Sequence, residues 1–420
     1  MTEITHSVDS LLNGRNQNSL NKGSTMSPFE WNFPTKLVYG PGKISSVGEI
    51  AANHGKKAMI ATYEKGSPLD PVIDIVEESL RSAGLDVVIF TGIEPNPRAQ
   101  TIDKATEIFL EEKCDLVIAL GGGSVIDGSK YIAATAFSGG KSWDYVVLGD
   151  RVPREYTGAF PIISIPTISA AGSECNAGGV IQNAETHEKS FSRSPYRIPK
   201  VAIVDPEILK SVPMRLTQDS CIDIFSHLVE HYLSSHDESE FADRMTEGMI
   251  LCLMDNFDKV VNDLEDLEVR GQLALCSIFG WSGFQALGRM GCIPMHSIEM
   301  PLSAYYDLPH GRGMVVVIPA YFKYMASAMP HRFAKLARRC FGVTESDDAK
   351  AAELLSVKVV EWFKRTDAFL TLSDVGIPDD KFEQMADDVV RMFPASEPQT
   401  TLGPRPIGKQ EIIDMYELMK

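Results

Sequence analysis

Cysteine is sparse in this chain and forms no recognisable pairing pattern. There are seven cysteines among 420 residues, and no two of them have the Cys-x-x-Cys spacing. An odd and dispersed set argues against a disulfide framework and against a zinc knuckle. We therefore expect a protein of a reducing compartment.

Long apolar runs are also missing. No stretch approaches the roughly 18 uninterrupted apolar residues that a membrane-spanning helix requires. Residues 1–27 are rich in Ser, Asn and Thr and lack the apolar segment of a signal peptide, so they are predicted to form a mobile tail. These absences predict a soluble, cytoplasmic protein that does not associate with membranes.

Positive charge is in deficit. Lys and Arg total 40 against 57 Asp and Glu, which gives a net charge of -17, and no run of basic residues interrupts the acidic background. Such a surface repels polyanions, and we expect no nucleic-acid partner. The 44% hydrophobic and 23% charged content is typical of a globular protein. A chain of this length exceeds a single core, which favours two domains.

The first half of the chain contains a series of short apolar runs that alternate with amphipathic segments. The runs are mostly continuous rather than alternating, as expected for strands of a parallel sheet covered on both faces. The predicted strands are 37–39, 58–62, 86–90, 116–120, 162–165 and 201–204, with helices at 71–82 and 102–112 between them.

The pattern changes after Asp205-Pro206, where an N-cap and a Pro at the first helical position predict a helix start. From Arg215 onward apolar residues recur at helical spacing. We therefore expect an α/β domain over 28–208 and an all-helical domain over 209–420. The cleft between two such domains is the expected place for chemistry.

The strongest local signal follows the predicted strand at 116–120. The strand leads directly into Gly121, Gly122, Gly123 and Ser124 and then into a helix. Bare backbone N–H groups at a helix N-terminus bind phosphate or pyrophosphate. The loop is neither the G-x-G-x-x-G fingerprint nor a Walker A loop. An ordinary glycine turn is the alternative.

A second signal is a set of metal-ligand residue types in the helical half. Asp223 and His227 are four residues apart, so both emerge on one helix face. His296 and His310 follow, the latter in Leu-Pro-His-Gly, where Pro and Gly are expected to break the helix. One carboxylate and three imidazoles suit one divalent metal, Fe(II) or Zn(II). The alternative is that each His is an ordinary surface or core residue.

Several ordered motifs extend these signals along the chain. They are PTKLVYGPG at 34–42, GGGSVIDGSK at 121–130, AGSE at 171–174, DIFSHLVE at 223–230 and the His-x13-His pair at 296 and 310. With them the chain resembles the iron-containing (group III) alcohol dehydrogenases from Phe29 to its end. Within that family it is most similar to the branch of butanol dehydrogenases and NADPH-dependent aldehyde reductases.

The resemblance implies a nucleotide-binding α/β domain and a metal-binding helical domain, with metal and nicotinamide meeting between them. It implies the metal ligands Asp223, His227, His296 and His310. It also implies that Gly121 to Ser124 hold the pyrophosphate and that Asp127 supports their loop. The residues implied to line the cofactor channel are Asn96, Thr167 and Lys189.

Two positions depart from the family pattern. Met300 stands where the family usually has a second His, commonly assigned a proton-relay or nicotinamide-orienting role. Methionine cannot transfer a proton, so water, a ribose hydroxyl of the cofactor or Glu299 would have to substitute. Ala171 replaces a common Thr, which removes one hydrogen bond to the cofactor.

Cofactor preference is expected from the turn after the second predicted strand. NAD-dependent relatives place an Asp directly after Thr62, where it would accept from the ribose 2'-hydroxyl and repel a 2'-phosphate. Here the residue is Tyr63, and Lys65 with Ser67 could hold a phosphate, whereas Glu64 argues for NAD. We predict NADP as cofactor, with NAD possible.

Together these features predict reversible, metal-assisted hydride transfer between a nicotinamide and a small aldehyde or primary alcohol. Three alternatives stay open. An anionic short-chain aldehyde would suit Arg193, Arg197 or Arg312, although paired or surface arginines are the simpler interpretation. A lyase similar to dehydroquinate synthase and a non-catalytic nucleotide-binding relative are the others. The resemblance also implies a homo-oligomer, most simply a homodimer.

Overall fold

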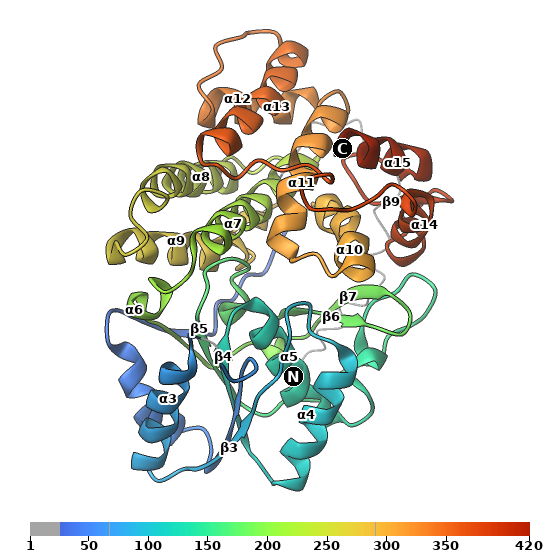
Figure 1. Ribbon diagram of the computed structural model, residues 1–420. Coiled ribbons are helices and arrows are strands. Elements are labelled where there is room, and N and C mark those ends of the chain that lie inside the picture. The colour runs from blue at the N-terminus through green and yellow to red at the C-terminus, as the bar shows by residue number, and fades with distance from the viewer. Residues whose placement is uncertain (1–25, 67, 290) are drawn as a thin grey trace.

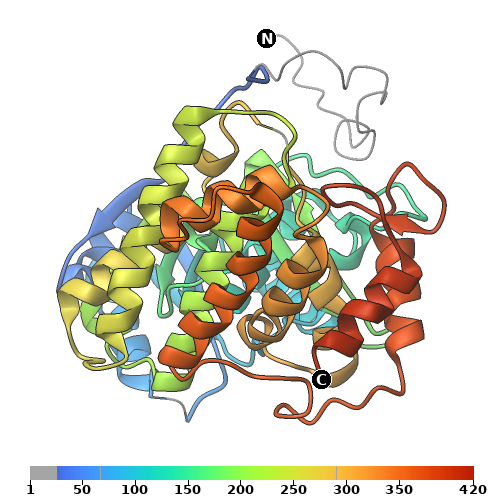
Figure 2. The same ribbon diagram turned by 90° about the horizontal axis from the view of Figure 1, so that it is seen from above.

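The structure is a computed structural model that describes residues 26–66, 68–289 and 291–420. An α/β half and a helical half are stacked on each other, with the helical half above in Figure 1. Seen from above, the helices of the second half cover the sheet (Figure 2). The two-domain architecture expected from the sequence is confirmed.

The α/β half is built on one six-stranded parallel sheet in the order β1-β8-β5-β4-β2-β3. The strands are β1 (Lys36–Tyr39), β2 (Lys57–Ala61), β3 (Asp86–Phe90), β4 (Leu116–Gly121), β5 (Ile162–Pro166) and β8 (Val201–Val204). All six predicted apolar runs form these strands.

Alternation along β4 explains why helices cover both faces of the sheet. Leu116 and Ile118 belong to the apolar core on the side of α2 (Val47–Ala51) and α3 (Asp70–Ser82). Val117 and Ala119 belong to the core on the side of α4 (Ala99–Glu111) and α5 (Gly123–Ser138). Because successive side chains of a strand point to opposite faces, a continuous apolar run fills both cores.

An antiparallel hairpin of β6 (Gly178–Asn183) and β7 (Glu188–Arg193) lies outside the main sheet, directly beneath α10 (Pro294–Tyr306) in Figure 1. This hairpin is not predicted from the sequence. Its strands carry mostly polar and glycine residues, so they lack the apolar run that identifies the other strands. The hairpin forms part of the junction between the two halves.

The helical half is organised around α7 (Met214–Ser234), which is buried along most of its length. The other helices are α6 (Pro206–Leu209), α8 (Glu240–Val260), α9 (Leu267–Gly280), α10, α11 (His310–Met325), α12 (Pro330–Cys340), α13 (Asp348–Arg365), α14 (Phe382–Met392) and α15 (Lys409–Leu418). Two short strands, β9 (Thr400–Thr401) and β10 (Ile407–Gly408), pair antiparallel, so this half is not made solely of helices.

Short 3₁₀ helices complete the secondary structure of the described residues. They are Lys43–Ser46, Ser142–Tyr145, Ser173–Cys175, Pro195–Arg197 and Phe284–Ala286. No helix among the described residues is both long and apolar enough to cross a membrane.

Asp205 joins the end of the sheet to the first helix after it. Its carboxylate accepts a hydrogen bond from the Glu207 backbone N–H at 3.1 Å, which confirms the predicted N-cap. The same carboxylate accepts from the N–H groups of Gly42 and Ile44, at 3.1 and 3.0 Å. It therefore also holds the turn that follows β1.

The segment before β1 lies against the helical half. Ser27 N–H donates to the Gly288 carbonyl at 2.8 Å, and Trp31 Nε1 donates to the Ser282 carbonyl at 3.1 Å. Most of the predicted tail over 1–27 lies outside the described residues. The division into 28–208 and 209–420 stays a prediction.

Candidate metal and cofactor site

Three helices bring the predicted metal ligands together. Asp223 and His227 lie on the same face of α7, His296 lies in the first turns of α10, and His310 is the first residue of α11. The break between α10 and α11 is made by Asp307, with a φ of 51°, and by Pro309. Since α11 starts at His310, its side chain turns back toward α7.

Gly311 has a different role from the helix break expected of it. It lies inside the first turn of α11, and a Cβ built there would be 2.8 Å from the Asp219 carbonyl oxygen. The missing side chain lets α11 approach α7 closely. Glycine at this position therefore brings His310 near Asp223.

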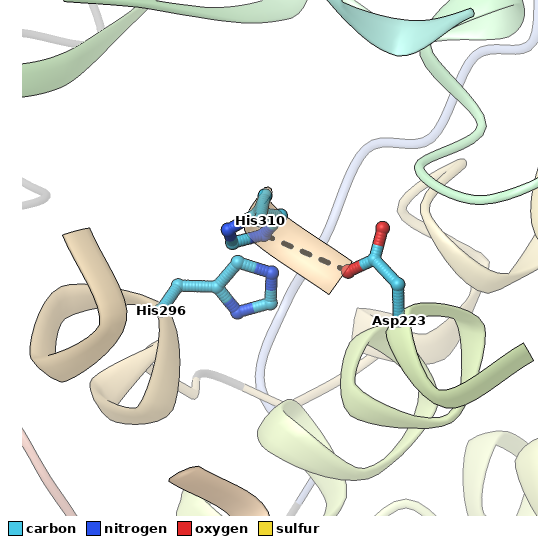
Figure 3. A group of neighbouring side chains, drawn as sticks. All are labelled: Asp223, His296 and His310. Carbon is cyan, nitrogen blue, oxygen red and sulfur yellow. Dashed lines mark ion pairs between the residues drawn. The ribbon is translucent and has the colours of Figure 1, made fainter. Parts of the chain in front are cut away.

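Ligand atoms of Asp223, His296 and His310 all lie within 4.8 Å of one another (Figure 3). His310 Nε2 is 3.6 Å from Asp223 Oδ1. His227 adjoins this group, with its Nε2 3.0 Å from His296 Nε2 and its Nδ1 3.9 Å from Asp223 Oδ1. The His310 side chain is 27% exposed, so the group is open to solvent on that side.

Glu230 holds His296 in place. Its Oε2 is 2.5 Å from His296 Nδ1, and its Oε1 accepts from the N–H groups of Met295 and His296, at 2.7 and 3.1 Å. Burial opposes the charged imidazole, but the Glu230 carboxylate raises the pKa of His296. A carboxylate on Nδ1 leaves Nε2 free to bind a metal. The sequence pattern did not single out Glu230 for this role, although Asp223, His227 and Glu230 have the spacing of one helix face.

Glu299 holds His310 in the same way. Its Oε2 contacts His310 Nδ1 and lies 3.6 Å from Lys189 Nζ, while Oε1 accepts from the Ser303 hydroxyl. Burial acts to raise the pKa of Glu299, but His310 and Lys189 together lower it to about 2. Both oxygens of this carboxylate are therefore engaged.

The buried donor atoms fit a divalent metal. Among the described residues, Asp223 Oδ1 and His227 Nδ1 are buried and have no hydrogen-bond partner. Burial lowers the pKa of His227 to about 3, which keeps this imidazole neutral and able to donate a lone pair. Unpaired buried polar atoms are costly, and a metal bound by oxygen and imidazole would satisfy them.

Trp281 forms an aromatic wall beside these ligands. Its ring lies 4.8 Å from the His227 ring and 6.0 Å from the His296 ring, and it also packs against His231 at 5.6 Å. His231 is half-buried there and is not part of the group of Asp223, His296 and His310. No pattern in the sequence points to Trp281, because it follows the end of α9 rather than lying on a helical face.

The glycine-rich turn joins β4 to α5. A Cβ on Gly121 would be 2.6 Å from Val125 Cβ, and a Cβ on Gly122 would be 2.7 Å from the Tyr63 hydroxyl oxygen. No side chain caps the N-terminus of α5. The N–H groups of Gly123 and Ser124 are therefore placed to meet an anion.

Tyr63 lies where β2 and β4 end side by side. Its hydroxyl oxygen accepts from the Gly122 N–H at 2.8 Å, and burial raises the pKa of its phenol. The chain crosses from β3 back over β2 to β4, which makes this edge a switch point of the sheet. Dinucleotides bind at such points in open α/β sheets.

Asp127 and Thr167 lie next to the glycine-rich turn. Thr167 N–H donates to the Gly121 carbonyl at 3.0 Å. Asp127 accepts from the Val180 N–H at 2.8 Å and from the Ser173 hydroxyl, so it braces β6 and the loop before it.

Asn96 and Lys189 link the two halves of the molecule. Lys189 Nζ donates to Asn96 Oδ1 at 3.0 Å and to Ser303 Oγ at 2.8 Å. Asn96 Nδ2 in turn donates to the Leu308 carbonyl at 3.2 Å. Both residues therefore lie at the junction where a cofactor on the sheet edge would meet the metal group.

Comparison with known proteins agrees with this geometry. The family description "Iron-containing alcohol dehydrogenase" matches residues 34–206, and "Fe-containing alcohol dehydrogenase family, C-terminal" matches residues 217–419. The chain belongs to the iron-containing alcohol dehydrogenase family.

Relatives cover nearly the whole of this iron-containing alcohol dehydrogenase. NADH-dependent butanol dehydrogenase A of Clostridium acetobutylicum is 32% identical over 93% of this chain and 99% of its own. An NADPH-dependent aldehyde reductase of Escherichia coli is 30% identical over 84% of this chain and 90% of its own. The crystal structure of NADH-dependent butanol dehydrogenase A from Thermotoga maritima superposes with a TM-score of 0.86, at 32% identity over 94% and 99% of the two chains.

Family membership confirms the predicted reaction class. This iron-containing alcohol dehydrogenase is an NAD(P)-dependent oxidoreductase of alcohols and aldehydes that uses a divalent metal. Both family descriptions concern alcohol dehydrogenases, so the lyase alternative has no support. The assignment of individual site residues stays a prediction.

Met300, at the position of the usual family His, is buried in an apolar cluster. The cluster also contains Ile93 and Ile181 of the α/β half. Met300 therefore packs across the junction between the halves. Its thioether offers no proton to a substrate.

The three candidate arginines have different surroundings. Arg197 is fully buried, lies 4.4 Å above the Tyr131 ring and bonds to the Ala177 carbonyl. Arg312 forms an ion pair with Asp219 at 2.9 Å. The simpler interpretation, packed or paired arginines, holds for these two. Arg193 is exposed at the end of β7.

Proposed function

We propose that this iron-containing alcohol dehydrogenase reduces small aldehydes to primary alcohols, with one divalent metal held by Asp223, His227, His296 and His310. The observation that carries the proposal is the convergence of Asp223, His296 and His310 within 4.8 Å, next to the junction with the nucleotide-binding half. Fe²⁺ and Zn²⁺ both suit this donor set.

In this proposal the bound metal supplies Lewis acidity toward the carbonyl oxygen and the nicotinamide supplies hydride. Glu230 contacts Nδ1 of His296, and Glu299 contacts Nδ1 of His310. These contacts orient both rings so that their Nε2 atoms are free to bind the metal. Trp281 packs beside the imidazoles of His227 and His296 on one side.

The proton that completes the alcohol has no donor at position 300. Glu299 is a poor substitute, because both of its oxygens are engaged by His310, Lys189 and Ser303. We therefore propose that water or a cofactor hydroxyl supplies this proton. Turnover would then depend on solvent reaching the site at the exposed side of His310.

We propose NADP as the preferred cofactor, with its pyrophosphate at Gly121 to Ser124 and with Asn96, Thr167 and Lys189 along its channel. Tyr63 supports this preference because it carries no carboxylate, and its hydroxyl is turned inward to Gly122. Lys65 is exposed beside it, whereas Ser67, the other expected phosphate contact, lies outside the described residues.

The test is to follow NADPH and NADH oxidation with a series of short aldehydes, before and after removal of metal with a chelator. We expect NADPH to be preferred, activity to disappear on chelation and Fe²⁺ or Zn²⁺ to restore it. His310→Ala should lose metal and activity. His236→Ala is the matched control, because His236 is exposed, bonds to the Pro404 carbonyl and is not part of the group of Asp223, His296 and His310.

Two results would contradict the proposal. Activity that survives complete metal removal would exclude the Lewis-acid role. Saturable NADPH binding without oxidation by any aldehyde would instead support the non-catalytic alternative.

We also propose a homodimer in the cytoplasm and a division of the chain near residue 208. Light scattering of the purified protein tests the homodimer. Limited proteolysis tests the division near residue 208, because an exposed connection between domains is the preferred cleavage point.

A further inference from the structure

Arg193 is an exposed arginine with no counterion among the described residues. It is the last residue of β7, paired with Gly178 of β6. Within the part of the chain that the structure describes, its guanidinium makes no ion pair, hydrogen bond or ring contact. Acidic residues outnumber basic ones in this protein by 57 to 40. An arginine that has no carboxylate partner in such a chain is available to a ligand.

Strand alternation tells which way Arg193 faces. Ser190 and Ser192 bond into the α/β half, the second of them to the Tyr131 hydroxyl at 2.8 Å. Lys189 faces the other way and bonds to Ser303 of α10. Since side chains two residues apart share a face of a strand, Arg193 lies on the face of Lys189.

The path of β7 carries Arg193 toward the metal ligands. The His187 ring stacks on Tyr305 at 5.4 Å, and Lys189 then contacts Ser303 and Glu299, so the strand runs toward the start of α10. Lys189 and Arg193 are separated by roughly 13 Å of strand. Ser303 and His296 are separated by roughly 10 Å of helix. Arg193 therefore lies alongside the end of α10 that carries His296.

Electrostatics place Arg193 in the same region. Burial is the main cause that lowers the pKa of His231, and the charges of Arg289 and Arg193 lower it further. The His231 ring packs on Trp281, which also packs on His227. Although part of the Arg193 side chain is exposed, the protein packed around it lowers its pKa by desolvation, and no carboxylate of the described residues offsets this effect.

We propose that Arg193 binds the carboxylate of a short aldehyde acid whose carbonyl oxygen lies at the group of Asp223, His296 and His310. The inference rests on the proposed function, because it needs an aldehyde at that group. A guanidinium presents two parallel N–H donors to a carboxylate, which sets the distance between the two ends of the substrate. Arg193 is thus a specificity residue for an ω-oxo acid.

The other source of an oxyanion is the nucleotide, whose phosphates carry the same chemistry. The two sources are separable by kinetics. A contact with substrate changes the KM of the oxo acid, whereas a contact with the nucleotide changes the KM of NADPH with every aldehyde.

The experiment compares 4-oxobutanoate with butanal, which have the same number of carbons and differ in charge. It uses the full-length, metal-loaded enzyme and the variants Arg193→Gln and Arg193→Lys. Glyoxylate and 5-oxopentanoate test the spacing. Arg365→Gln is the control, because Arg365 is an exposed arginine on α13 that pairs with Asp258 at 2.9 Å.

We expect the wild type to prefer the oxo acid and its kcat/KM to peak at one chain length. Loss of charge-assisted hydrogen bonds in Arg193→Gln should lower kcat/KM for the oxo acid by about 10- to 100-fold, mainly through KM. Butanal and NADPH kinetics should stay unchanged. Arg193→Lys should recover part of the loss, and Arg365→Gln should resemble wild type.

Three outcomes would overturn the inference while leaving the proposed function intact: butanal preferred over the oxo acid, an equal loss for both aldehydes, or a rise in the KM of NADPH. If neither aldehyde is reduced by the wild type, the proposed function itself fails. The wild-type measurement therefore distinguishes failure of the Arg193 inference from failure of the proposed function.

Discussion

Replacing Glu230 with Gln should weaken metal binding without removing any ligand. Glu230 accepts three hydrogen bonds, from His296 Nδ1 and from the N–H groups of Met295 and His296. A glutamine has one acceptor oxygen in place of two. If that oxygen keeps the backbone N–H groups, its amide NH₂ faces His296 Nδ1, and the imidazole proton must move to Nε2, where it blocks the lone pair that a metal requires.

The opposite rotamer is no better, because the NH₂ group then faces two backbone donors and leaves them unsatisfied. Loss of an orienting partner of this kind typically costs 10- to 100-fold in metal affinity, which is about 1.4 to 2.8 kcal/mol. The measurement is competition between apoprotein and a chromophoric chelator for Zn²⁺. A second measurement is the shift in Tm on adding metal, which should be smaller in the variant.

Glu247→Gln is a matched control, because Glu247 is also a buried carboxylate of the helical half. It accepts from the Tyr232 hydroxyl at 2.7 Å and pairs with Arg339 at 2.8 Å. We expect it to change stability and leave metal affinity unchanged. Equal metal affinity in Glu230→Gln and wild type, with both folded, would refute the orienting role of Glu230.

Two further predictions concern the α/β half. Tyr63→Asp places a carboxylate where a 2'-phosphate would lie, so the ratio of kcat/KM for NADPH to that for NADH should fall by at least about tenfold; an unchanged ratio would remove Tyr63 from cofactor selection. Burial raises the pKa of Glu174 from 4.5 to about 7, so the folded state retains its proton longer than the unfolded state and stability falls as pH rises through that interval. Glu174→Gln has no carboxyl to titrate, so it should not lose stability in this way. The free energy of unfolding of the variant minus that of wild type, measured in urea, should therefore rise by up to about 3 kcal/mol between about pH 5 and pH 8. A difference that does not change with pH would contradict the burial effect.

The parallel sheet was predictable because its signal is local. Each buried strand is a continuous apolar run, and Gly121 to Ser124 follow one of them directly. The hairpin of β6 and β7 was not predictable in this way. Its residues are held by contacts such as that of Lys189 with Ser303, more than a hundred positions away.

The proposed metal ligands divide in the same manner. Asp223 and His227 share a helix face by spacing alone, and Glu230 continues that face. His296 and His310 meet them only because α10 and α11 fold back onto α7. The helix break at Pro309 and the close approach of α11 to α7 at Gly311 bring these histidines back to α7. The periodicity of apolar residues predicts neither feature.

By itself, then, the sequence determined the residue types of the proposed metal site, the glycine-rich turn and the positions of the parallel strands along the chain, because each depends on neighbours within a few turns. Only the tertiary structure decided that Glu230 and Glu299 contact the imidazoles, that Trp281 packs beside them and that Arg193 has no counterion in the described part of the chain. Those properties depend on which faces of distant segments are in contact. The packing of the whole chain decides these contacts, and a local sequence pattern does not encode them.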